Sequence, residues 1–241
     1  MARFVLCHGA FAGAWCWEPV VGPLGARGHT VETLDLPGSG QDQTPVEGVT
    51  LEACAARVTD VLAGAGEEPA ILVGHSMGGV VCTQAYANAP ERVSKIVYLT
   101  AFIPADGQSL LDLTATPEGA GDQVQANIEV SGEPPVAHLS AEATRNALYN
   151  LCSDEQWEWA SKLRRDQAVA PFATPVALHG VVAEPSRRAY IHCLQDHAIP
   201  LALQRRMVRE NPCDEVFELD ADHAPYLSRT AEVVELLDRL A

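Results

Sequence analysis

The sequence is poor in basic residues. Lys and Arg number 16 against 32 Asp and Glu, which gives a formal net charge of −16 and an isoelectric point near 4.8. Binding to nucleic acid needs clustered Lys and Arg to neutralise phosphates, and anionic membrane surfaces attract polybasic segments. The composition therefore argues against both partners, and it also disfavours a strongly anionic substrate.

The sequence also lacks long hydrophobic runs and paired cysteines. No stretch of about 18 apolar residues is present, so we expect no transmembrane helix. The N-terminal apolar run, residues 4–7, is too short for a signal peptide and has no cleavage-site pattern. The seven cysteines are scattered without Cys-x-x-Cys spacing, which argues against zinc and dithiol redox sites. We therefore expect free cysteines and a cytoplasmic protein.

What is present is an alternation of strand-like and helix-like segments. A chain of 241 residues with 47% apolar residues is long enough for one α/β domain with an insertion. The alternation predicts an α/β fold with a mostly parallel six-stranded sheet and helices on both faces. Apolar runs predict strands at 4–7, 31–34, 70–73, 93–99, 188–194 and 215–219. Helical spacing predicts helices at 15–24 (interrupted by Pro19), 51–62, 79–87, 201–210 and 231–240, and residues 63–66 are expected to form a loop.

The alternation stops near Pro104. Residues 104–180 are rich in Gly, Pro, Glu and Ala. We interpret this segment as a mainly helical cap, inserted after the strand that ends near Leu99. Residues 1–103 and 181–241 then form the core domain.

The pentapeptide Gly74-His75-Ser76-Met77-Gly78 has the pattern G-x-S-x-G and lies between a predicted strand and a predicted helix. This arrangement is typical of the nucleophile elbow of α/β-hydrolases, in which a sharp turn exposes a serine hydroxyl. Small residues on either side of the serine allow strand and helix to pass closely. Ser76 is therefore the predicted nucleophile.

A serine needs a base to take its proton, and in this fold the chain order is Ser, then Asp or Glu, then His. His223 follows the last predicted strand and is the predicted base. Asp196 follows the preceding strand and is the predicted acid, with Asp106 as the alternative. Asp220 and Asp222 lie too close to His223 in sequence and are expected to be solvated loop carboxylates, whereas His8 and His75 are expected to be structural.

The oxyanion hole needs two backbone N–H donors. Met77, directly after the nucleophile, and Ala10, in the Gly-containing loop after the first strand, are the predicted donors. A substrate pocket is expected between the sheet and the cap. Trp157 and Trp159 are expected to point to opposite sides of a cap helix, so that at most one faces the pocket. The candidate substrate-binding residues are Gly9, Phe11, Trp15, Phe102, Leu148, Tyr149 and Trp157.

Several segments together resemble the plant hydroxynitrile lyase and methylesterase group, which includes the salicylate-binding esterases, and its bacterial esterase and pyrethroid-hydrolase relatives. The resemblance implies Ser76, Asp196 and His223 as the triad and Ala10 and Met77 as oxyanion donors. It covers most of the chain and is weakest at about 105–145. The matching segments are 8–10, 13–17, 28–31, 34–40, 73–79, 99–104, 148–152, 190–200 and 222–223.

Two positions favour an esterase over a lyase within this group. The lyases of this fold carry a threonine in the first oxyanion loop and a lysine directly after the catalytic histidine. The matching residues here are Gly9 and Ala224, so the cation that stabilises departing cyanide is missing.

We therefore expect a carboxylesterase-type serine hydrolase that acts on a small, neutral, moderately hydrophobic ester and needs no metal or organic cofactor. A homodimer is compatible with the resemblance. Hydroxynitrile cleavage, thioester hydrolysis, ligand binding without turnover and natural-product tailoring remain open alternatives at this point.

Overall fold

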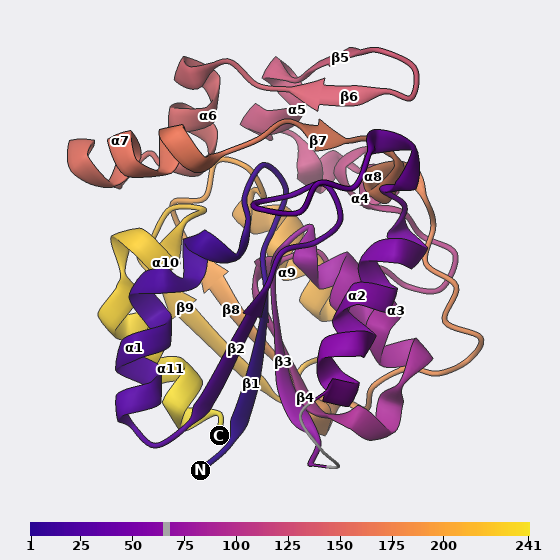
Figure 1. The fold of residues 1–241 in the computed structure, drawn as a ribbon, viewed down its shortest axis with the longest axis vertical. Coiled ribbons are helices and arrows are strands. Elements are labelled where there is room, and N and C mark those ends of the chain that lie inside the picture. Colours follow the sequence, from indigo (N-terminus) through magenta and orange to yellow (C-terminus); the bar gives the residue numbers. More distant parts are fainter. Residues whose placement is uncertain (65–67) are drawn as a thin grey trace.

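Six parallel strands form the central sheet of the protein (Figure 1). The structure is a computed structural model and describes residues 1–64 and 68–241. The strand order is β2-β1-β3-β4-β8-β9, which confirms the predicted six-stranded sheet. The strands are β1 (Arg3–Cys7), β2 (Thr30–Leu34), β3 (Ala70–Ser76), β4 (Val93–Ala101), β8 (Arg188–Cys193) and β9 (Glu215–Leu219).

The burial of each strand follows its place in the sheet. Every residue of β1, β3 and β8 is buried, as expected for mainly apolar strands covered on both faces. The edge strands β2 and β9 are only partly buried and carry charged residues such as Glu32, Glu215 and Glu218. The apolar core therefore centres on β1, β3, β4 and β8.

Helices cover both faces of the sheet, as predicted. Helices α1 (Glu18–Ala26) and α11 (Thr230–Arg239) pack together on one side, and α2 (Leu51–Gly64) and α3 (Gly78–Asn88) pack together on the other (Figure 1). Helix α9 (Leu201–Glu210) connects β8 to β9, and α10 (Pro225–Ser228) follows the loop after β9.

Two details differ from the sequence-based prediction. Pro19 does not interrupt a helix, because it occupies one of the first two positions of α1, where a missing N–H breaks no helical hydrogen bond. A short 3-10 turn at Ala14–Trp17 precedes it. The predicted loop at 63–66 is partly wrong, since Ala63 and Gly64 still belong to α2, and Ala65 and Gly66 lie outside the described residues.

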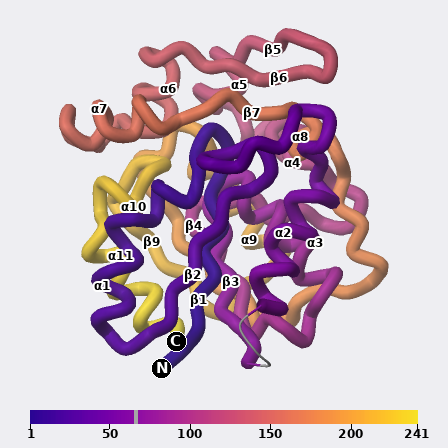
Figure 2. The backbone as a smooth tube through the Cα atoms, viewed as in Figure 1, coloured from indigo at the N-terminus to yellow at the C-terminus, as the bar shows by residue number. Residues whose placement is uncertain are grey.

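Most of the segment between β4 and β8 lies over the carboxyl ends of the strands, and its last part, after α8, runs down the side of the molecule to the start of β8, as the chain path in Figure 2 shows. Its helices are α4 (Leu110–Thr114), α5 (Gln123–Asn127), α6 (Ala141–Leu148), α7 (Asp154–Leu163) and α8 (Ala170–Ala173). It also contains a small antiparallel sheet of β5 (Glu129–Ser131), β6 (Val136–His138) and β7 (Gln167–Ala168), which the sequence did not predict. Strands of two or three residues are too short to show a period of two.

All seven cysteines are free thiols, and six of them are buried as small apolar side chains. Over residues 1–64 and 68–241, no helix combines the length and the apolar character that a membrane span needs.

Candidate active site

Ser76 ends β3 in a strained turn. Its φ angle is 55°, in the left-handed region that non-glycine residues seldom adopt, and α3 begins two residues later at Gly78. A Cβ at Gly74 would lie 2.8 Å from the carbonyl oxygen of Gly78, and a Cβ at Gly78 would lie 2.7 Å from the carbonyl oxygen of His8. The glycines of the pentapeptide are therefore required by close backbone approach, and the turn has the geometry of a nucleophile elbow.

Asp196 and His223 form a buried pair. His223 lies in the loop after β9 and donates from Nδ1 to Oδ2 of Asp196 over 2.7 Å. The other carboxylate oxygen, Oδ1, accepts the N–H groups of Ala198 at 2.7 Å and Ile199 at 2.9 Å. An imidazole held in this way keeps its Nε2 free to accept a proton. The structure thus brings together the acid and base predicted from chain order.

Thr100 completes the surroundings of Asp196. Its hydroxyl donates to Asp196 Oδ2 over 2.5 Å, and the side chain is fully buried near the end of β4. Sequence reasoning did not select Thr100, which lies 96 positions from Asp196. The signal that could have identified it is its place at the carboxyl end of a central strand, beside the other functional loops.

Two buried histidines, His8 and His75, hold the loops of the site. Nε2 of His8 accepts the N–H of Leu36 at 3.1 Å, so its Nδ1 donates to the Gly9 carbonyl oxygen at 2.7 Å. Nε2 of His75 lies 2.7 Å from the carbonyl oxygen of His223 and donates to it. Burial is the main cause that lowers the pKa of both imidazoles, and for His75 the pKa lies well below its usual range. Both rings are therefore neutral scaffolding groups.

The prediction for Asp222 was wrong. Its side chain is fully buried and accepts hydrogen bonds from the N–H of Leu151 at 2.9 Å and the hydroxyl of Ser228 at 2.6 Å. Asp222 therefore ties the loop of His223 to the segment above the sheet. The prediction considered only its closeness to His223 in sequence and so missed this role. Asp220 is exposed, as expected.

Asp106, the alternative acid, does not join this site. Its carboxylate accepts the N–H of Leu178 at 2.7 Å, and it lines a different cavity together with Arg188.

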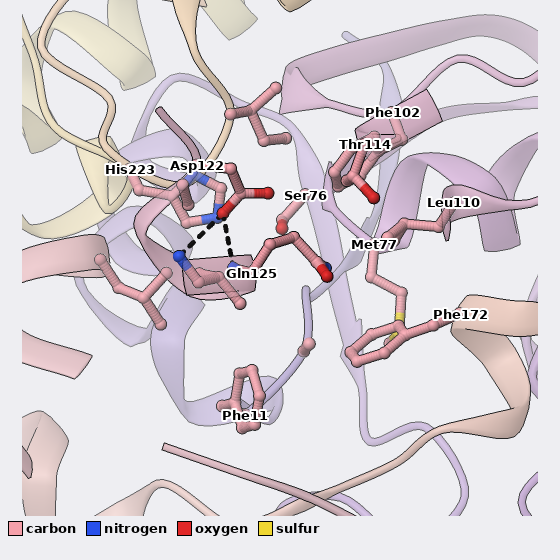
Figure 3. Close-up of a pocket in the computed structure, with 15 residues that line it drawn as sticks. Phe11, Ser76, Met77, Phe102, Leu110, Thr114, Asp122, Gln125, Phe172 and His223 are labelled. Atoms are coloured by element: carbon pink, nitrogen blue, oxygen red, sulfur yellow. Dashed lines mark hydrogen bonds between the residues drawn. The ribbon is translucent and has the colours of Figure 1, made fainter. Parts of the chain in front are cut away.

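A cavity opens beside Ser76 and His223. Figure 3 shows the side chains of Ser76, Asp122 and His223 turned into this space, with aromatic and aliphatic groups around them. Its mostly apolar lining with a few polar groups is typical of a small-molecule site. Of the predicted residues, the cavity is lined by Ala10, Phe11, Ser76, Met77, Phe102, Leu148 and His223.

Four predicted substrate-binding residues lie outside this lining. A Cβ at Gly9 would lie 2.7 Å from Cβ of Ser76, so Gly9 provides space under the serine. Trp15 packs edge-on against Trp159 with ring centroids 5.2 Å apart, and Trp157 packs against Tyr149 at 5.4 Å. The two tryptophans of α7 thus have different partners, and neither lines the cavity. Packing between aromatic rings, which sequence alone does not reveal, accounts for these three positions.

Asp122 lines the cavity although sequence reasoning did not select it. It is buried at the start of α5 and accepts the N–H groups of Val124 at 2.7 Å and Gln125 at 2.9 Å through Oδ1. Burial raises the pKa of the Asp122 carboxyl to about 6, and nearby Asp196 adds to this, while the two N–H donors and His223 oppose it. The residue falls in the segment where the resemblance is weakest.

Comparisons with known proteins agree with this geometry. Putative methylesterase 11, a chloroplastic protein of Arabidopsis thaliana, is 34% identical over 248 residues, which are 99% of this chain and 64% of that protein. The chain thus spans less than two thirds of that relative. Methylesterase 7 of the same plant is 32% identical over 259 residues, covering 99% of this chain and 96% of the relative.

A solved structure shares the fold along nearly the whole chain. A pyrethroid hydrolase from Sphingobium faniae JZ-2 superposes with a TM-score of 0.87 at 28% identity, covering 99% of this chain and 96% of the other. These relatives confirm the resemblance to methylesterases and pyrethroid hydrolases that the motifs indicated. A family model described as the alpha/beta hydrolase family matches residues 4–236. The chain therefore belongs to the alpha/beta hydrolase family.

Proposed function

We propose that this protein is a serine-dependent carboxylic ester hydrolase with Ser76, His223 and Asp196 as its triad. The observation that carries the proposal is the buried Asp196–His223 pair, joined over 2.7 Å, at a cavity that also contains Ser76 in its strained turn. A nucleophile, a base and an orienting acid are the three groups that acyl transfer needs. The similarity to methylesterases and to a pyrethroid hydrolase supports the same class of reaction.

The reaction would proceed in two halves. His223 Nε2 accepts the Ser76 hydroxyl proton while Oγ attacks the ester carbonyl, and the N–H groups of Ala10 and Met77 hold the oxyanion. His223 then returns the proton to the departing alcohol, which leaves an acyl-enzyme. Water, activated in turn by His223, hydrolyses that ester and releases the acid and free Ser76. Each oxyanion donor would contribute about 3–4 kcal/mol to the stability of the transition state.

The cavity favours a small, neutral, moderately hydrophobic ester, because most of its lining is apolar. The relatives named as methylesterases make a methyl ester the first alcohol to test. Hydroxynitrile cleavage is the weaker reading, since Ala224 is fully buried and brings no cation to the site, and Gly9 replaces the threonine of the lyases.

The test is the hydrolysis of p-nitrophenyl esters from acetate to octanoate by the wild type, Ser76→Ala and His223→Ala. We expect each substitution to lower kcat by at least roughly 10³-fold, with folding intact by circular dichroism. A folded wild type that hydrolyses none of these esters, or a Ser76→Ala variant with full activity, would contradict the proposal. In that event cyanohydrin cleavage, binding without turnover and a rearranged product become the alternatives to assay.

A further inference from the structure

The feature behind this inference is the single carboxyl group in the otherwise mostly apolar cavity at Ser76. Among the described residues that line it, Asp122 is the one acidic side chain. It is only 6% exposed, so its surroundings are set by the protein rather than by bulk water. Neither the proposed triad nor the oxyanion donors use it, and a buried carboxylate without a full set of partners is costly.

The position of Asp122 is fixed by its neighbours. Its own N–H bonds the Gly119 carbonyl oxygen at 3.2 Å, and the N–H of the next residue, Gln123, bonds the carbonyl oxygen of His197 at 2.8 Å. His197 directly follows the proposed acid Asp196. The carboxyl group is thus held in a defined place relative to the triad, as a specificity group requires.

The two oxygens of the Asp122 carboxyl differ. Oδ1 accepts the N–H groups of Val124 and Gln125, whereas Oδ2 makes no hydrogen bond with any of the residues that the structure describes. In Figure 3 the dashed lines run to one oxygen, and the other oxygen points toward Ser76. An ionised carboxylate accepts hydrogen bonds and donates none. The cavity that Ser76 lines therefore presents an acceptor that no described residue uses, on the side that faces Ser76.

We propose that Asp122 is a specificity-determining residue that selects esters carrying a hydrogen-bond donor, such as a hydroxyl group, next to the ester carbonyl. This inference rests on the proposed ester hydrolysis at Ser76. A donor on the substrate forms a hydrogen bond with the free oxygen, and this bond takes the place of one that the oxygen makes with water before the substrate binds. An acceptor or an anionic group at the same place has no proton to donate to the carboxylate, so an ester that carries such a group binds less well. Its raised pKa of about 6 leaves Asp122 mostly ionised at neutral pH.

The test compares three methyl esters with one carbon skeleton at pH 7.5. Methyl phenylacetate has no polar group next to the carbonyl, each enantiomer of methyl mandelate has a hydroxyl there, and methyl α-methoxyphenylacetate has an acceptor that lacks the proton. For the wild type we expect kcat/KM for one mandelate enantiomer to exceed that of the other two esters by roughly tenfold, the worth of one hydrogen bond to a charged group.

The decisive variant is Asp122→Asn. Asparagine keeps an oxygen for the N–H groups of Val124 and Gln125, and it caps helices as well as aspartate does, so folding is retained. Its amide then turns an NH₂ donor toward Ser76. We expect the preference for mandelate to disappear or to invert toward the methoxy ester.

Asp112→Asn is the matched control. Asp112 is an exposed carboxylate in the first turn of the neighbouring helix α4, so its substitution removes the same charge outside the cavity and should leave the preference unchanged. The inference is overturned if the wild type shows no preference for a mandelate enantiomer, or if Asp122→Asn keeps that preference. In either case, Ser76-dependent hydrolysis of methyl phenylacetate would still support the proposed function. If the wild type hydrolyses no ester of any kind, both the proposed function and the inference fail.

Discussion

At the scale of single residues, both carboxylate oxygens of Asp196 accept hydrogen bonds. Its Oδ2 accepts both Nδ1–H of His223 and the hydroxyl of Thr100, at 2.7 and 2.5 Å. Thr100 therefore holds the Asp196 carboxylate in place against His223 without lining the cavity, which makes it a positioning residue.

Replacing Thr100 by valine removes the hydroxyl and preserves the shape of the side chain. We expect kcat/KM for a p-nitrophenyl ester to fall by about tenfold, which corresponds to one charge-assisted hydrogen bond. Thr100→Ser retains the donor and should restore the activity. An unchanged kcat/KM in Thr100→Val would show that the threonine is only a packing group.

Asp122 also has a consequence for stability. Burial raises the pKa of Asp122 from 3.8 to about 6 in the folded protein. Between pH 3.8 and pH 6 the native state therefore binds more protons than the unfolded state, and the free energy of unfolding falls as the pH rises through this window. Asp122→Asn removes the titrating group and keeps the helix cap. In urea unfolding we expect the variant to exceed the wild type at pH 7.5 by up to about 3 kcal/mol, and to match it near pH 4. A variant that is less stable at pH 7.5 would contradict this assignment.

The residues of the site differed in how far the sequence alone could predict them. Ser76, Asp196 and His223 each follow a strand with a strong apolar pattern, so their chain order and their common edge of the sheet could be inferred. Thr100 also follows a predicted strand, but it belongs to no catalytic motif, and its contact with Asp196 crosses to the loop after the neighbouring strand β8. Asp122 follows no predicted strand, and its place depends on the fold of the segment above the sheet, which only the structure reveals. Asp222 was misjudged because its partner Leu151 is 71 positions away.

At the scale of elements, the junction between β3 and α3 tolerates no added atoms. A Cβ on Gly79 in α3 would lie 2.3 Å from the carbonyl oxygen of Phe102, whereas a Cβ on Gly25 in α1 would have no neighbour within 4 Å. We expect Gly79→Ala to lower the free energy of unfolding by about 2–3 kcal/mol through overpacking.

The same change at Gly25 should raise the unfolding free energy by about 0.5–1 kcal/mol, because alanine loses less entropy than glycine in a helix. Urea unfolding of both variants checks the pair. Equal effects at the two positions would mean that the close approach of α3 to the strand end is not a real constraint.

The elements also show which patterns determine a fold from sequence. The six strands of the main sheet were located to within about three residues, since their apolar runs lie between turn residues. The strands β5, β6 and β7 have only two or three residues each, so no periodicity marks them. The cap boundaries at 104 and 180 remain a prediction.

At the scale of the whole molecule, three buried histidines make folding depend on pH. Burial is the main cause that lowers the pKa of His8, His75 and His192. Below a pH of about 6.5 these imidazoles bind protons in the unfolded chain but stay neutral in the native state, so the free energy of unfolding falls as the pH falls. Protonation of Asp122 raises the stability as the pH falls, but it is one group, whereas the three imidazoles together lower it.

We therefore expect the urea midpoint to decrease from pH 7.5 to pH 5.5. The measurement is a series of urea unfolding curves at constant ionic strength. A midpoint that stays constant or rises over this range would show that the three imidazoles become charged in the native state. The predicted cytoplasmic location and homodimer also belong to this scale and remain predictions.

We propose that Ser76 is a nucleophile activated by His223. The most direct measurement treats the folded protein with an alkyl fluorophosphonate and follows its intact mass, since attack by Oγ on phosphorus expels fluoride and leaves a stable adduct. We predict one adduct per chain, mapped by peptide mass to Ser76, absent in Ser76→Ala and strongly slowed in His223→Ala. An unlabelled wild type, or equal labelling of Ser76→Ala, would contradict the account.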